Sequence, residues 1–245
     1  MRNIKLTIEY DGKDFNGWQK QPNKLNIQGT IEKAIERITG EQIELMASGR
    51  TDAGVHALGQ VANFKTNSNI PIDKFAIAIN SNLKKSIVIQ SAEEVDERFH
   101  SRLSCKKKTY RYVINNSRYG TAIYRNLETH IPVKLDIEKM KQAVKYFEGE
   151  HDFKAFKASG TSSKSSVRTI YKAEVIQKES DKIWIELTGN GFLYNMVRII
   201  SGTLVEVGLG KIQPQEIEDI IKLGKRENAG KTLPPQGLYL LNVEY

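Results

Sequence analysis

The chain has 245 residues, of which 39% are hydrophobic and 27% charged, so it can bury a core without disulfides or a structural metal. Its 37 Lys and Arg residues outnumber its 29 Asp and Glu residues, and the resulting net charge of +8 favours a polyanionic partner. Cys105 is the only cysteine, which excludes an intrachain disulfide and suits a reducing cytoplasm, and no apolar stretch approaches the ~20 residues of a membrane span.

The N-terminal half is expected to alternate strands and helices. Apolar and polar side chains alternate over residues 4–10, which predicts a half-buried strand, and the following Asp-Gly pair ends it with a turn. Apolar residues at helical spacing over 27–38 predict a helix that ends at Gly40. The other elements expected in this half are an extended segment at 42–47, a helix over 72–79 that Pro71 opens, and a strand at 87–90.

The C-terminal half is expected to contain a second, similar succession of strands and helices. A strand is expected at 109–114, then a helix over 137–147 with Asp136 as its N-cap. The later elements are a hairpin of strands at 170–177 and 182–187, an apolar helix over about 193–207, a short helix after Pro214 and a closing strand at 238–243. The small polar residues at 157–166 predict a mobile loop. Interleaved strands and helices indicate an α+β fold whose sheet faces are covered by helices.

The stretch SGRTDAGVHALGQ at residues 48–60 is the most informative. Its three glycines predict a tight, irregular backbone that holds Arg50, Asp52 and His56 beside a strand. Two interpretations are open: a structural turn in which Asp52 bonds to its own backbone, or a site that presents a reactive carboxylate.

Two further stretches carry candidate functional residues. In CKKKTYRYVI, Tyr110 and Tyr112 fall on one face of a strand beside three lysines, which suits stacking on a displaced base or, equally, ordinary packing. In NGFLYNMVRIISGTL, Arg198 interrupts an apolar helix, so it either pairs with a buried carboxylate or extends from a half-exposed face. The histidines are scattered and no nucleotide-binding fingerprint is complete, so neither a metal nor an organic cofactor is expected.

At these residues the sequence resembles the TruA family of tRNA pseudouridine synthases. GRTDAGVHA is the most specific of the shared segments, and their order and spacing cover essentially the whole chain. Ser101, where alanine is common, is a small departure from the family pattern. The other segments are IEYDGKDFNGWQKQ, IQGTIEKAI, RFHSRLSCKKKTYRY, NGFLYNMVR and GLYL.

The resemblance implies a pseudouridine synthase fold. Two similar α/β halves, 1–105 with the aspartate loop and 106–245 with the tyrosine and arginine, would form a continuous antiparallel sheet flanked by helices around a central cleft. It also implies a cytoplasmic homodimer that isomerises uridines at tRNA positions 38, 39 and 40 in the anticodon stem-loop. A synthase of the same family acting on other RNA, or an RNA-binding module without catalysis, are the alternatives.

The resemblance also implies roles for individual residues. Asp52 matches the catalytic nucleophile, Tyr110 the tyrosine that stacks on the base, and Arg198 the cation that pairs with Asp52. Arg50 is a second cation able to keep the carboxylate ionised, since a nearby guanidinium offsets the cost of burying a charge. Leu240 is expected to form an apolar wall of the substrate site, although Leu238 and a plain core role are alternatives.

Overall fold

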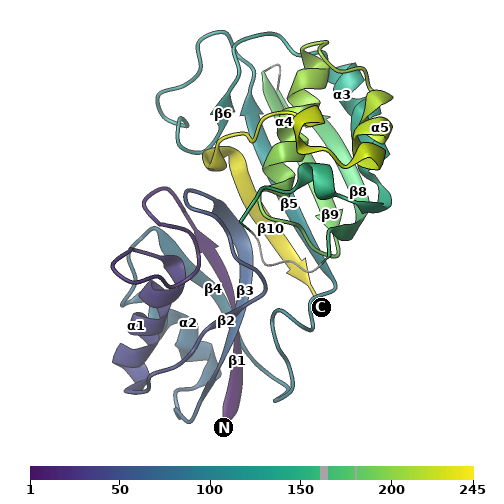
Figure 1. Ribbon diagram of the computed structural model, residues 1–245. Coiled ribbons are helices and arrows are strands. Elements are labelled where there is room, and N and C mark those ends of the chain that lie inside the picture. The colour runs from purple at the N-terminus through teal and green to yellow at the C-terminus, as the bar shows by residue number, and fades with distance from the viewer. Residues whose placement is uncertain (161–164, 180) are drawn as a thin grey trace. The chain divides into compact units, whose positions relative to one another are not determined.

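The structure is a computed structural model that describes residues 1–160, 165–179 and 181–245 (Figure 1). The chain divides into two compact units, Met1–Lys106 together with Tyr239–Tyr245, and Lys107–Leu238. The halves expected from the sequence were 1–105 and 106–245; here residues 239–245 are grouped with the first unit and Leu238 with the second. Of the expected mobile loop at 157–166, residues 161–164 lie outside the described residues.

The first unit is built on a mainly antiparallel sheet in the order β4-β1-β3-β10. Strands β1 (Arg2–Tyr10), β3 (His56–Thr66) and β4 (Ile87–Val95) pair antiparallel, and the short β2 (Met46–Ala47) pairs with β3. Strand β10 (Leu238–Glu244) lies parallel to β3, with Tyr239 opposite His56 and Leu240 opposite Ala57. A strand from the far end of the chain therefore extends the N-terminal sheet beside the start of β3.

Helices α1 (Ile27–Thr39) and α2 (Ile72–Asn80) complete the core of this unit. Asn26 caps α1 by accepting the Gly29 N–H at 2.8 Å, and Gly40 ends it with φ +73°. The ring of Phe64 on β3 packs against Phe75 of α2, with centroids 6.1 Å apart. Because side chains alternate along a strand, the neighbours of Phe64 on β3 point to the opposite face of the sheet.

The second unit contains a sheet in the order β6-β5-β9-β8-β7. Its strands are β5 (Lys107–Asn115), β6 (Thr129–His130), β7 (Gly149–Asp152), β8 (Val167–Gln177) and β9 (Lys182–Gly189); the β5–β6 pair is parallel and the others antiparallel. The helices α3, α4 and α5 gather together in this unit (Figure 1). They span Ile137–Val144, Met196–Gly208 and Glu216–Leu223, and short 3-10 turns lie at Lys145–Phe147, Lys154–Phe156, Arg226–Asn228 and Pro235–Gly237.

The expected α+β class is confirmed, as are Asp136 as the N-cap of α3 and the β8–β9 hairpin. The sequence analysis missed β3, because that strand is buried on both faces and carries no alternating pattern that would reveal it. It also began the apolar helix too early, since α4 starts only at Met196. Within the described residues, every helix is too short or too polar to cross a bilayer.

Candidate active site

The first unit carries Asp52 on the loop 48–55, which joins β2 to β3. Gln60, a fully buried residue of β3, holds the start of this loop. Its side-chain amide donates to the carbonyl oxygen of Gly49 at 3.0 Å, and its side-chain carbonyl accepts from Ser48 Oγ at 2.7 Å. A buried amide bonded through both ends fixes the loop backbone more firmly than solvent-exposed turn contacts would.

A second support comes from the segment 12–18, which follows β1. The Trp18 N–H donates to the carbonyl oxygen of Thr51 at 3.0 Å. Gly17 has φ +82°, and a Cβ placed there would lie 2.6 Å from that same carbonyl oxygen. Only glycine therefore fits at this position, because any other side chain meets both the strained backbone and the loop. The IEYDGKDFNGWQKQ segment thus serves to support the aspartate loop.

The side chains of the loop point in different directions. The Thr51 hydroxyl is buried and lies 2.7 Å from the hydroxyl of Tyr10. Burial raises the pKa of Tyr10, although the bond to Thr51 opposes that shift, so the phenol stays protonated at neutral pH and can donate. Arg50 is exposed and Asp52 is half-buried. The backbone is anchored while the two charged side chains remain at the accessible side of the loop.

His56 follows the loop at the start of β3 and is buried. Its Nδ1 lies 3.1 Å from the backbone N of Gly12, which donates to it, and 3.1 Å from Asp11 Oδ1. Its ring stacks on Tyr239 of β10 with centroids 4.8 Å apart. These contacts make His56 an anchor between the loop, the turn after β1 and the C-terminal strand.

In the second unit, Tyr110 lies on β5 with only 8% of its surface exposed. Phe192 meets its ring edge-on, with centroids 5.1 Å apart. Tyr112 is also buried, while the guanidinium of Arg111 lies over the ring of Trp184 at 3.6 Å, so the expected alternation of this strand is confirmed. Tyr110 is held in one orientation by aromatic packing.

Arg198 lies in the first turn of α4 and is half-buried. Its Nε donates to the carbonyl oxygen of Leu233 at 2.7 Å, and its Nη1 donates to Asn195 Oδ1 at 2.7 Å. The guanidinium is therefore oriented by neighbours within its own unit. The expected pairing with Asp52 would join the two units and belongs to the function proposed below.

Leu240 has no exposed surface and pairs with Ala57 in the sheet, as a core residue does. Its role as a wall of the substrate site stays a prediction. The sequence analysis missed Tyr10, Gln60 and Asn195 as supports of the site. Asn195 had a usable signal, because a residue three positions before Arg198 on a helix lies on the same face.

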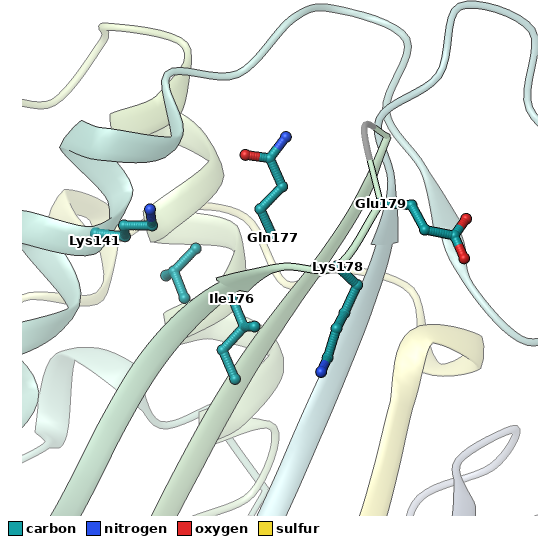
Figure 2. Close-up of a pocket in the computed structure, with 6 residues that line it drawn as sticks. Lys141, Ile176, Gln177, Lys178 and Glu179 are labelled. Carbon is teal, nitrogen blue, oxygen red and sulfur yellow. The ribbon is translucent and has the colours of Figure 1, made fainter.

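The second unit also has an open surface hollow of about 550 Å³ (Figure 2). It is lined by Lys141 and residues 175–179, none of which is a predicted site residue. In Figure 2 the side chains of Gln177, Lys178 and Glu179 point in different directions and do not converge on one point. A catalytic centre needs converging groups, so this hollow is not a competing candidate.

A family model described as tRNA pseudouridine synthase matches residues 6–103 and 143–245, and the chain belongs to this family. It is 54% identical to the tRNA pseudouridine synthase A of Acetivibrio thermocellus and 52% identical to that of Caldicellulosiruptor bescii, in each case over 245 residues and 100% of both chains. It is also 53% identical over the full length to the tRNA pseudouridine synthase A of Ruminiclostridium cellulolyticum.

Among solved structures, that of a Cbf5-Nop10-Gar1 complex matches 96% of this chain and 57% of that chain, with 14% identity and a TM-score of 0.37. The chain thus spans somewhat more than half of that structure's chain. At this level the similarity adds nothing to the family assignment.

Proposed function

We propose that the protein isomerises uridine to pseudouridine in the anticodon stem-loop of tRNA, at positions 38, 39 and 40, with Asp52 as the nucleophile. One observation carries the proposal: GRTDAGVHA forms a loop anchored by buried side chains, in a chain 54% identical over its full length to a tRNA pseudouridine synthase A. A cytoplasmic location and a homodimer form part of the proposal and rest on the family resemblance.

The reaction must move the uracil from N1 to C5 attachment on the same ribose. In the proposed course, the Asp52 carboxylate attacks C1′ and the electron pair of the N1–C1′ bond leaves with the base. After the base turns, C5 attacks C1′ and displaces the carboxylate, then C5 loses its proton and N1 gains one. Arg198 and Arg50 keep the carboxylate ionised and oriented. Atoms and electrons balance without a redox partner or water.

The uridine must first leave its stack, because neither C1′ nor C5 can be reached in a paired nucleotide. Eversion costs a few kcal/mol, and stacking on an aromatic ring returns about 1–3 kcal/mol per base. Tyr110, which Phe192 holds in one orientation, supplies that ring in the proposed complex. Stacking favours no particular flanking sequence, which suits an enzyme that accepts uridines at neighbouring positions.

The test is the variant Asp52→Asn, which keeps the size of the side chain and removes its charge. We expect tritium release from C5-labelled uridine in tRNA to fall by at least about 10³-fold, because the nucleophile is lost, while the Kd for tRNA changes less than about threefold. Tritium release at the wild-type rate would reject Asp52 as the nucleophile.

A wild-type protein that binds tRNA but forms no pseudouridine would instead support the non-catalytic RNA-binding module. The other alternative, a synthase acting on different RNA, is tested by mapping pseudouridines in RNA from cells with and without the protein. Loss of the modification at positions 38–40 of tRNA is the expected result.

A further inference from the structure

Residues 96–106, here called the anchored arch, contain the RFHSRLSCK segment that the catalytic proposal leaves without a role. We propose that the anchored arch binds backbone phosphates of the RNA substrate through Arg98, Arg102 and Lys106. The inference rests on the proposed function, since the RNA in question is the substrate of the synthase.

The arch covers the face of the first sheet that the helices leave open. Phe64 of β3 points toward α2, so the preceding Asn63 points to the other face. There the Asn63 side-chain oxygen accepts from both the backbone N–H (2.9 Å) and the hydroxyl (2.8 Å) of Ser101. Asn63 and Ser101 are both fully buried. The Ser101 hydroxyl thus adds a second hydrogen bond, beside that of its backbone N–H, at the point where the arch meets the sheet.

Two further side chains hold the arch. Asn3 of β1 donates to the backbone carbonyls of Asp96 at 2.9 Å and Phe99 at 3.0 Å. The Tyr245 hydroxyl donates to the carbonyl of Ser101 at 2.9 Å, and its ring packs on Phe99 with centroids 4.8 Å apart. A buried polar network is costly unless every member is bonded, so these contacts hold the arch in a single shape.

The arch also stabilises its own turn. His100 Nδ1 accepts the backbone N–H of Arg102 at 3.1 Å, and the His100 N–H donates to Ser104 Oγ at 3.2 Å. Since Nδ1 acts as an acceptor, the proton of the neutral ring sits on Nε2, where it is a donor. At the end of the arch, the Lys106 N–H donates to the carbonyl of Glu244 at 2.8 Å.

Three of the side chains that the arch exposes are cationic, and two, Asp96 and Glu97, are acidic. Arg98, Arg102 and Lys106 are exposed, and none of them forms an ion pair with a carboxylate of the described residues. The acidic residues of the arch are otherwise engaged. Asp96 Oδ1 accepts the Arg98 N–H at 2.8 Å, and Glu97 lies 3.7 Å from Lys65 Nζ.

Unpaired guanidinium groups on a rigid backbone are suited to phosphate, because the planar fork bonds two oxygens and little conformational entropy is lost on binding. Contacts to phosphate position an RNA without reading its sequence. Leu103, which is 78% exposed, is the one large apolar residue of the arch that is exposed, too little for a protein interface dominated by apolar contacts.

The test compares Arg98→Gln/Arg102→Gln with the matched control Lys84→Gln/Lys85→Gln, which removes the same charge from exposed residues of the same unit. The Kd for unmodified tRNA is measured from 50 to 300 mM KCl. We expect the arch variant to bind about tenfold more weakly and to lower the slope of log Kd against log salt by about 1.4–1.8, since each of the two phosphate contacts contributes about 0.7–0.9. The control is expected to bind tRNA and form pseudouridine as the wild type does.

Equal salt slopes for the arch variant and the control would overturn the proposal. A change in the sedimentation mass of the arch variant, with its tRNA affinity unchanged, would also overturn it, because the arch would then be a protein interface. Failure of the proposed function is separate, because the wild type would then release no tritium whatever the arch does.

Asn63→Ala tests the anchoring, with the arginines intact. It should weaken tRNA binding severalfold while thermal unfolding shows a folded protein. If it unfolds, the arginine variant still decides the proposal.

Discussion

Asn195 adopts a left-handed backbone conformation, with φ +59°, immediately before α4. Asparagine tolerates this conformation better than most residues, but it still carries strain. Its side chain receives one of the Arg198 N–H groups at 2.7 Å. The strain therefore occurs where it places an acceptor beside the guanidinium expected to orient Asp52, so we infer that Asn195 is a positioning residue.

Replacing Asn195 separates strain from positioning. Asn195→Gly keeps the backbone conformation and loses the acceptor, so kcat should fall about tenfold, the value of one hydrogen bond, with the Kd for tRNA unchanged. Asn195→Ala should show the same lowered kcat as the glycine variant, and its free energy of unfolding should be about 1–2 kcal/mol lower than that of the glycine variant. Asn195→Asp retains an acceptor and should restore most of kcat. Wild-type kcat in the glycine variant would contradict the role.

At the scale of elements, Gly17 and Gly40 form a natural comparison. Both have positive φ, but a Cβ at Gly17 would lie 2.6 Å from the Thr51 carbonyl, whereas at Gly40 nothing lies within 4 Å. Gly40→Ala should therefore lower the free energy of unfolding by only about 1 kcal/mol, from the strain of an alanine at positive φ, and leave kcat unchanged. Gly17→Ala should lower the free energy of unfolding by roughly 3 kcal/mol and lower kcat at least tenfold, because the aspartate loop must move to make room for the methyl group.

Denaturant unfolding and tritium release measure both glycine variants. If Gly17→Ala lost no more stability and activity than Gly40→Ala, the segment 12–18 would not be a support of the loop.

The elements that the sequence predicted well are those with an amphipathic pattern and a local end signal. Helix α1 has both, with an apolar stripe between the Asn26 cap and Gly40. Strand β3 lacks the amphipathic pattern, because helices cover one of its faces and the anchored arch covers the other. Its assignment needed partners that lie far away in the sequence.

At the scale of the whole molecule, the buried Tyr10 and Tyr112 and the half-buried Tyr245 predict loss of stability in alkali. Burial raises the pKa of Tyr10, Tyr112 and Tyr245 above the ordinary value near 10. Between pH 10 and their raised pKa values, the unfolded chain loses these protons and the folded chain keeps them. Stability is therefore complete below about pH 10 and declines above it, by up to about 1.4 kcal/mol per pH unit for Tyr10 and for Tyr112, and by less for the half-buried Tyr245, whose contacts water screens.

The alkaline loss is measured by denaturant unfolding at pH 8 to 11. Tyr10→Phe should lower stability at pH 8, because Thr51 loses its buried partner, and should flatten the decline above pH 10. Tyr119→Phe is the control, since Tyr119 is 82% exposed. An equal decline in wild type and Tyr10→Phe would show that the Tyr10 phenol does not titrate with folding.

The sequence by itself determined the α+β class, most helices, and the family, through the order of its short motifs and above all GRTDAGVHA. It also singled out Arg198, because a guanidinium in an apolar helix is costly without a partner, and it gave Asp52 and Tyr110 their predicted roles through the family resemblance. Only the tertiary structure decided that β10 extends the N-terminal sheet, that Tyr10 and Gln60 hold the aspartate loop, and that Asn63 anchors the arch. Those contacts join residues from 11 to 183 positions apart, and local propensity carries no information about partners so distant.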